Sequence, residues 1–347
     1  MKLLTIVGIF FLVIGAVTVI FAIASGKDRY TEDVMARFVG NIVAGIIAVF
    51  VTPIVLNIVR VKFGDRIIAL IPEGLIGDEA LLELGISIVF AATGIIHFAL
   101  LYLILYLLFR IPGTIYSNRS EEKEHQSLPV CILVSAFSCA FTLYLLFSPF
   151  YCVVYSVAAD ASVILKTEPQ YPEARNVISN LIVGMDGFGT VEEVDNLGKR
   201  RNFLNSFVYD RVATFKYADG TTTGIHKIMN ETVTTLSSVL EAIPADFAPG
   251  ANKTTVDVVR VAKNQFLGAT FLRVIISDIV RGASKAWYNG EDYVLIGSVS
   301  NPFLDTDFEE TANKYFEILK DANDDEIVSA MDSALNALES FIEGYDD

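Results

Sequence analysis

Long runs of apolar residues fill most of the first 155 or so positions of the chain, and short clusters of charged residues separate them. Crossing a ~30 Å hydrocarbon core as a helix takes about 20 residues. Inside a bilayer every backbone polar group has to be satisfied within the segment, so each run of this length is predicted to be a helix. We therefore expect a four-helix transmembrane bundle over residues 1–157, with spans at about residues 3–24, 39–59, 84–109 and 128–154.

The first run also has a second interpretation. Lys2, the hydrophobic stretch and Ala22-Ile23-Ala24 before Ser25 are typical of a secretory signal peptide with a small-residue cleavage site. The run is longer than the ~7–15 apolar residues of a usual signal peptide. A retained helix is therefore the favoured interpretation, and a cleaved signal is the alternative.

Prolines and one mixed segment interrupt the later runs. Thr52-Pro53 is expected to bend the second run, and Ser148-Pro149 is expected to end or kink the fourth. Between the second and third runs, residues 65–84 alternate isoleucines and leucines with charges. This pattern predicts a short helix in the membrane interface or a cap over the bundle.

Small residues recur at four-residue spacing on two of the runs. Such faces let helix backbones approach closely where no hydrophobic effect drives association. They predict a tight bundle within one chain, which is the favoured interpretation, or a contact between copies. The residues are Gly40, Ala44, Gly45 and Ala48 on the second run, and Ala136 and Ala140 on the fourth.

Two polar residues stand inside the apolar runs: Asn41 near the start of the second and His97 in the third. An ionisable group in a membrane helix is by default a hypothesis of function. No Asp, Glu, Lys or Arg lies in the interior of any run, so a proton or ion relay through His97 would lack partners. A hydrogen bond between helices is the favoured explanation of His97.

The chain changes character at about residue 158. Its 53% hydrophobic content and its mean hydropathy of +0.49 come from the runs before that point. From residue 160 onward, 30 Asp and Glu stand against 16 Lys and Arg, which accounts for nearly all of the net charge of −15. This balance argues against binding nucleic acid and against docking on anionic lipid. Residues 158–347 are therefore predicted to be an acidic, water-exposed domain.

Helix signals predict that this domain is α-helical, so the whole chain is expected to be an all-α polytopic membrane protein. Capping boxes at Thr190 and Glu193, at Thr306 and Glu309, and at Asn323 and Glu326 mark three helix starts. Periodic apolar residues complete the pattern, with Gly268 and Gly282 as candidate interruptions of the longest helix. Helices are expected at about 174–183, 190–215, 225–243, 254–287, 308–319 and 327–342, and only 292–299 reads as extended.

Candidate chemistry is sparse. His226 is the single histidine of the acidic domain, and a solvated or capping role is the favoured interpretation. The glycine-rich residues 184–189 read as a turn, and the acidic residues 321–326 read as a solvated helix start rather than a cation site. No nucleotide-binding or metal-binding motif is present. The sequence therefore predicts no catalytic residue, no metal and no cofactor.

Basic residues give the expected orientation. With four spans, loops one and three carry six Lys and Arg, against four on the side of the acidic domain. The positive-inside rule then places the acidic domain outside the cytoplasm, whereas a cleaved signal would place it inside. In the acidic domain, Lys199-Arg200-Arg201 is the one basic run. It is expected either to form internal salt bridges or to face lipid headgroups.

A pattern in the first half of the chain runs from Gly15 through Gly26-Lys27-Asp28-Arg29 into a second span rich in Gly and Ala, which ends at Val51-Thr52-Pro53. With the interfacial segment and two spans that follow, it resembles the colicin V production protein (CvpA) family of bacterial inner-membrane proteins. The resemblance implies a protein of the cell envelope with a non-enzymatic role in export or envelope maintenance. It carries over no site residues.

Two functions are compatible with these patterns. The favoured one is a membrane-anchored envelope or scaffold protein whose acidic helical domain binds a protein partner or a second copy of the chain. The alternative is a transporter or channel component with a path along the small-residue faces and His97. In both cases the lipid bilayer is an expected partner.

Overall fold

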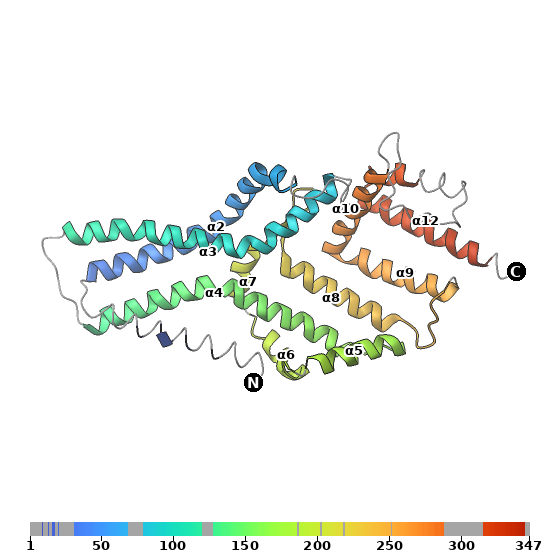
Figure 1. Ribbon diagram of the computed structural model, residues 1–347, viewed down its shortest axis with the longest axis horizontal. Coiled ribbons are helices and arrows are strands. Elements are labelled where there is room, and N and C mark those ends of the chain that lie inside the picture. The colour runs from blue at the N-terminus through green and yellow to red at the C-terminus, as the bar shows by residue number, and fades with distance from the viewer. Residues whose placement is uncertain are drawn as a thin grey trace.

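The computed structural model describes residues 31–68, 79–119, 128–287 and 315–343, except positions 186, 202, 218 and 251, together with five isolated positions before residue 31. Its first part consists of three long helices, α2 (Thr31–Ile68), α3 (Glu79–Arg119) and α4 (Leu128–Lys166) (Figure 1). By length and composition each could cross a membrane, over Phe38–Gly64, Gly85–Phe109 and Ile132–Lys166. The span predicted at residues 3–24 lies almost wholly outside the described residues, so the count of four stays a prediction.

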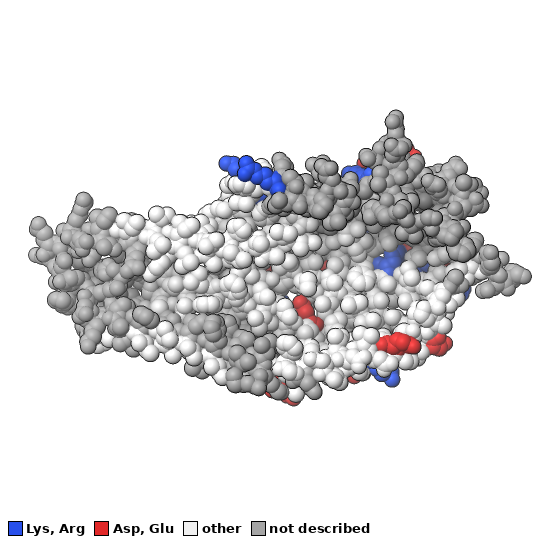
Figure 2. Space-filling model, in the orientation of Figure 1, with Lys and Arg blue, Asp and Glu red and all other residues white. Residues whose placement is uncertain are grey.

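The three helices are longer than a membrane requires. They contain 38, 41 and 39 residues, so at 1.5 Å per residue each is about 57–62 Å long, roughly twice the thickness of the hydrocarbon core. On the face shown in Figure 2, the described surface of the bundle carries no Lys, Arg, Asp or Glu, and charged side chains begin where the helices leave the bundle. Residue 157, the predicted domain boundary, lies inside α4, which continues to Lys166 without a break.

The ends of the helices splay apart. In Figure 1, α2 and α3 turn away from α4 on the side of the bundle that faces the rest of the chain. Pro53 and Pro149 both lie inside their helices, so the prediction that Pro149 could end the fourth span is wrong. A later helix, α7 (Phe203–Val212), packs against all three long helices where they splay.

One hydrophobic core joins the bundle to α7. Buried residues of the three long helices pack together with Val208, Tyr209 and Val212 of α7, namely Ala44, Ala48, Val49, Ile95, Phe98, Tyr102, Leu145 and Cys152. The closest approach is at Gly94 of α3, where an added Cβ would overlap the carbonyl oxygen of Val212. The part of the chain after α4 is therefore fixed to the bundle by packing and does not hang from a linker.

The helix predicted from Thr190 toward residue 215 is interrupted. Its capping box forms as predicted, because Glu193 N donates to Thr190 Oγ1 at 3.2 Å and Thr190 N donates to Glu193 Oε2 at 2.8 Å. The helix that it opens, α6 (Val191–Gly198), ends after eight residues. At Gly198 the chain touches α4 so closely that a Cβ would lie 2.7 Å from Ala159 Cα. Packing on α4 thus accompanies the end of α6, which the local pattern did not indicate.

A small hairpin, which the sequence patterns did not predict, follows α7 between the helices expected at 190–215 and 225–243. Strands β1 (Thr214–Lys216) and β2 (Thr222–Gly224) pair antiparallel, with Phe215 opposite Thr223. The turn between them contains Gly220 at φ 85°, a conformation that glycine adopts without strain. The hairpin leads directly into α8 (Ile225–Ala242).

The remaining helices largely follow the sequence patterns. The expected helix at 254–287 is divided at Gly268 into α9 (Lys253–Gly268) and α10 (Thr270–Trp287), while Gly282 lies within α10. The capping box at Asn323 forms and opens α12 (Asp324–Glu343). Of the helix predicted at 308–319, residues 315–319 are described and are helical, and the fragment 292–299 lies outside the described residues.

Polar contacts hold α6 on the end of α4. Asp195 of α6 accepts from Lys166 Nζ at 2.5 Å, from Lys199 Nζ at 2.6 Å and from Ser162 Oγ at 2.9 Å. These donors hold the pKa of the Asp195 carboxyl well below its usual range. Lys199 therefore forms an internal salt bridge, one of the two roles expected for the basic run, while Arg200 and Arg201 are exposed.

Candidate functional site

Asn41 is the polar centre of the bundle. Its side chain is buried, and its amide nitrogen donates to Ser138 O at 2.8 Å and to Thr142 Oγ1 at 2.5 Å. Its amide oxygen accepts from the hydroxyl of Tyr102. One side chain thus links α2 to both α3 and α4. Both ends of the amide are bonded within the protein, which is the arrangement of a structural residue.

His97 is half-buried on α3. Its Nδ1 lies 2.9 Å from the carbonyl oxygen of Thr93, one turn earlier on the same helix. The bond that the structure shows therefore lies within α3 and not, as predicted, between two helices. Among the described residues, no carboxylate or second histidine lies beside it to form a relay.

The small residues of the second run pack as a contact face. Ala44 and Ala48 are fully buried, and a Cβ added to Gly40 would lie 3.3 Å from Phe109 Cβ of α3. A Cβ added to Gly45 would overlap the side chain of Leu145 on α4. This face of α2 therefore contacts both neighbouring helices of the bundle.

The small residues of the fourth run behave differently. Ala136 is half-buried and Ala140 is exposed. Between them, the hydroxyls of Ser138 and Thr142 point toward α2 and bind Asn41. The contact face of α4 is therefore partly polar and lies to one side of the predicted alanine stripe.

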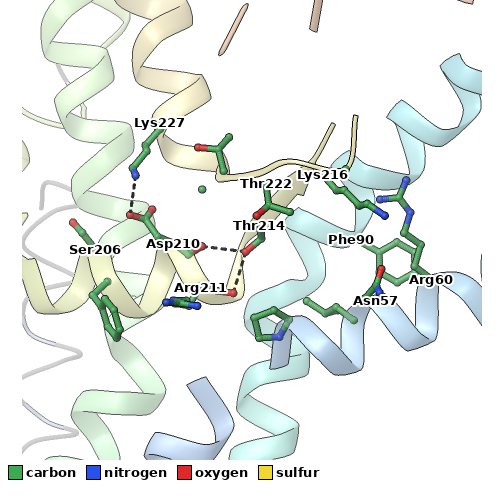
Figure 3. A pocket seen from close by; sticks show the side chains of 16 residues that line it. Asn57, Arg60, Phe90, Ser206, Asp210, Arg211, Thr214, Lys216, Thr222 and Lys227 are labelled. Carbon is green, nitrogen blue, oxygen red and sulfur yellow. Dashed lines mark hydrogen bonds and ion pairs between the residues drawn. The ribbon is translucent and has the colours of Figure 1, made fainter. Parts of the chain in front are cut away.

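A cavity of about 630 Å³ lies where the bundle meets the rest of the chain (Figure 3). Its wall combines the splayed parts of α2 and α3, the helix α7, the β1–β2 hairpin and the first turn of α8. The α2 and α3 side of the wall is partly apolar, with Pro53, Leu56 and Phe90. Segments far apart in the sequence thus build one pocket at the junction.

Cations dominate the polar part of this junction pocket. Arg60, Arg211, Lys216 and Lys227 line it, and Asp210 is the one carboxylate among its described lining residues. Figure 3 shows Arg60 and Lys216 on one side of the pocket and Lys227 with Asp210 on the other. In a chain with a net charge of −15, four cations against one carboxylate mark this pocket as a local exception.

Asp210 is held by the start of α8. Its Oδ1 lies 2.5 Å from His226 Nδ1, and its Oδ2 lies 3.9 Å from Lys227 Nζ. Gly224 makes room for the pair, because a Cβ there would overlap Asp210 Oδ1. The charge of Asp210 is therefore opposed by its own neighbours at this end of the pocket.

His226 is buried rather than solvated, contrary to the favoured interpretation of the sequence. Its ring packs 5.6 Å from the ring of Tyr209, whose pKa burial raises to about 12, so that the tyrosine stays neutral at physiological pH. Among the described residues, no Ser, Thr or Cys side chain is hydrogen-bonded to His226. The Asp210–His226 pair thus joins α7 to α8 and is not placed beside a nucleophile.

Arg211 lies against one aromatic ring of the bundle and one of its own helix. Its guanidinium carbon is 5.2 Å from the centre of the Phe50 ring of α2 and 5.8 Å from that of Phe207 in α7. The two rings meet edge to face at 6.4 Å. Since Phe50 is half exposed and lies within the apolar stretch Phe38–Gly64 of α2, these contacts place a cation beside the apolar surface of that helix.

The other candidate sites have structural explanations. In the glycine-rich stretch, Phe188 N donates to Met185 O at 2.8 Å, as in a turn. In the acidic cluster, Asp324 pairs with Arg281 at 2.8 Å and Asp325 with Arg273. Within the described part of the chain, no group of three His, Cys, Asp or Glu side chains could hold a metal ion.

No protein-family model matches the chain, and neither curated proteins nor solved structures show a detectable similarity to it. The resemblance to the colicin V production protein family therefore stays a prediction. Two features of the molecule bear on its function: the junction pocket and the outer surface of the helices that follow α4.

Proposed function

We propose that the protein is a membrane-anchored scaffold whose acidic helical part binds another protein. The observation that supports this is the surface of α5 (Pro172–Gly184), which has one buried residue, Ile178. Val177 and Leu181, which lie one turn apart on the same side of the helix, expose 58 and 44% of their surface. Contiguous apolar patches on water-exposed parts of proteins commonly mark interaction sites. We call these two residues the α5 face.

The surroundings of the α5 face indicate the chemistry of its partner. Glu173, in the first turn of α5 and one turn before Val177, is exposed on the same side of the helix. An apolar strip that begins beside a carboxylate fits an amphipathic helix whose apolar residues are flanked by Lys or Arg. The proposed partner is a protein that presents such a helix.

The transport alternative lacks comparable support in the described bundle. Phe98 and Tyr102 fill its centre and are completely buried. The polar atoms of Asn41 are bonded to neighbouring helices, and His97 is bonded to its own helix. Anchoring is therefore the function that we propose for the membrane part.

The partner proposal is tested by changing the α5 face in the full-length protein. The double substitution Val177→Glu, Leu181→Glu is expected to reduce partner recovery at least tenfold, because two charges would be buried in an apolar contact. The measurement is photo-crosslinking from position 184, which is exposed on the same side of α5, in native membranes, followed by identification of the crosslinked protein.

Val259→Glu on α9 is the matched control, since Val259 is a valine with a similar exposure, 45%, on another helix. It is expected to leave the crosslinked product unchanged. Equal recovery from the double variant and the unchanged protein would refute the proposed contact. So would an equal loss in the Val259→Glu control.

We further propose that the protein resides in a bacterial inner membrane with α5 to α12 outside the cytoplasm. The basic loops predicted on the opposite side of the membrane support this orientation. A cysteine introduced at the exposed position Glu192 is expected to react with a membrane-impermeant thiol reagent in intact cells. Labelling only after the cells are lysed would place these helices in the cytoplasm instead.

A further inference from the structure

The junction pocket lies at the level of a membrane surface. Gly40 approaches Phe109, so Phe38 of α2 and Phe109 of α3 lie at the same end of the bundle. A hydrocarbon core takes about 20 residues. Counted from Phe38, this length reaches Asn57, and counted back from Phe109 it reaches Phe90. Asn57 and Phe90 both line the pocket.

The fourth span gives the same level. About 20 residues from Ile132 reach Tyr151. The ring of Tyr151 stacks on that of Tyr155 at 6.1 Å. Tyrosines gather at the depth of lipid headgroups, where the ring is in apolar surroundings and the hydroxyl is in water. Three helices thus place the pocket at the boundary between hydrocarbon and water.

The pocket is cationic on one side and apolar on the other. Arg211 is exposed and lies over Phe50, and Lys216 forms no ion pair with any described residue. Beside these cations, Pro53 and Leu56 belong to the apolar stretch of α2. On the outside of the same stretch, Ile54 and Ile58 expose 59 and 50% of their surface. A phosphate at the cations would have apolar helix surface beside it.

We propose that the junction pocket binds a phosphate-bearing anion, with Lys216 and Arg211 as its principal cationic contacts. A guanidinium offers paired donors to phosphate oxygens, and an ammonium offers a compact charge. The pocket lies at the boundary between hydrocarbon and water and has an apolar side. Both features match the headgroup and first chain carbons of an anionic phospholipid. A soluble phosphate ester has the same binding chemistry, and the experiment separates the two sources.

Asp210 does not prevent this binding. Its carboxylate is held by His226 and lies beside Lys227, at the side of the pocket opposite Arg60 and Lys216 (Figure 3). A phosphate at Lys216 would therefore meet a cation on the side of the pocket away from that carboxylate, whereas Arg211 is drawn on the same side as Asp210 (Figure 3). The proposal goes beyond partner binding and does not depend on the α5 face.

The test compares lipid binding by variants of the purified full-length protein. The chain is placed in neutral phosphatidylcholine nanodiscs, and binding of phosphatidylglycerol is titrated by native mass spectrometry. Removing one cation near a membrane surface weakens attraction to anionic lipid by about fivefold. Lys216→Gln is expected to weaken phosphatidylglycerol binding by at least that factor, and Arg211→Gln with Lys216→Gln by more.

Lys62→Gln is the matched control. Lys62 is an exposed cation of α2, two residues after Arg60, and it does not line the pocket. A site in the pocket predicts a loss in Lys216→Gln and less than twofold change in Lys62→Gln. Equal losses in the two variants would show attraction to the general surface and overturn the proposal. Absence of any preference for phosphatidylglycerol over phosphatidylcholine would also overturn it.

A competition experiment identifies the source of the phosphate. Glycerol 3-phosphate and inorganic phosphate are added at millimolar concentration to the same samples. No displacement of phosphatidylglycerol supports the lipid as the ligand. Displacement that is lost in Lys216→Gln supports the same pocket with a soluble phosphate ester. Thermal unfolding of each variant confirms that the chain is folded before binding is compared.

Discussion

Replacing Gly94 by alanine is expected to destabilise the protein more than any other single methyl group added to the bundle. The new Cβ would overlap the carbonyl oxygen of Val212, which is backbone and cannot move aside as a side chain can. Overpacking of a filled core typically costs about 1–3 kcal/mol. Thermal unfolding in detergent should show a clear decrease in the midpoint.

The control for this prediction is on the same helix. Gly85→Ala adds the same methyl group where no atom lies within 4 Å. Because alanine favours the helical conformation over glycine by about 1 kcal/mol in soluble helices, this variant should be as stable as the unchanged protein or more so. If Gly94→Ala unfolds at the same temperature as Gly85→Ala, then α7 does not pack on α3 as described.

Replacing Asn41 by leucine is expected to loosen the bundle itself. The change removes the bonds to Ser138 and Thr142, and it leaves the buried hydroxyl of Tyr102 without its acceptor. Hydrogen bonds between membrane helices contribute about 0.6–1.7 kcal/mol, and an unsatisfied buried group adds about 1–3 kcal/mol. A loss of several kcal/mol should appear as unfolding at lower denaturant in a micelle titration.

The matched variant is Asn57→Leu, at an exposed position on the same helix. It should change the unfolding midpoint little, because it removes no buried bond. A further substitution, Tyr102→Phe, should partly rescue Asn41→Leu, since it removes the hydroxyl left without an acceptor. Failure of this rescue would mean that Tyr102 and Asn41 are not coupled.

The three long helices that could cross a membrane were predictable because each contains one continuous apolar run. The position of Asn41 was also visible in the sequence, but its partners were not. Ser138 and Thr142 are ordinary residues of helices, and only the crossing of α2 and α4 brings their oxygens to the amide. A local pattern predicts that a polar group is buried, whereas its hydrogen-bond partners depend on how the helices pack.

The end of α6 illustrates the same limit. The capping box at Thr190 was read correctly from four residues, because its two bonds lie within one helical turn. The stop at Gly198 depends on the backbone of Ala159 in another helix. The extended segment at 214–216 follows from the pairing with β2 and from burial of Phe215, both of which are tertiary. Such interruptions are caused by packing between helices, so the periodicity of apolar residues along the sequence does not show them.

The acidic net charge of the chain gave no indication of the cationic junction pocket. An excess of acidic residues argues against anionic ligands when charges are averaged over a domain. Averages do not say where charges lie, and Arg60, Arg211 and Lys216 come from three segments that converge only in the fold. Their common feature in the sequence is a position at or just beyond an apolar stretch, which is a weak signal by itself.

The uninterrupted course of α2, α3 and α4 has a mechanical consequence. A membrane helix answers a change in bilayer thickness by tilting. Since no linker lies between the bundle and the helices packed on its end, the whole water-exposed part turns with the bundle as a lever. Over a helix of about 60 Å, a tilt of roughly 10° moves the far end sideways by about 10 Å and changes its height by only about 1 Å. The place over the membrane that α5 reaches would therefore shift sideways with the thickness of the lipid around the bundle.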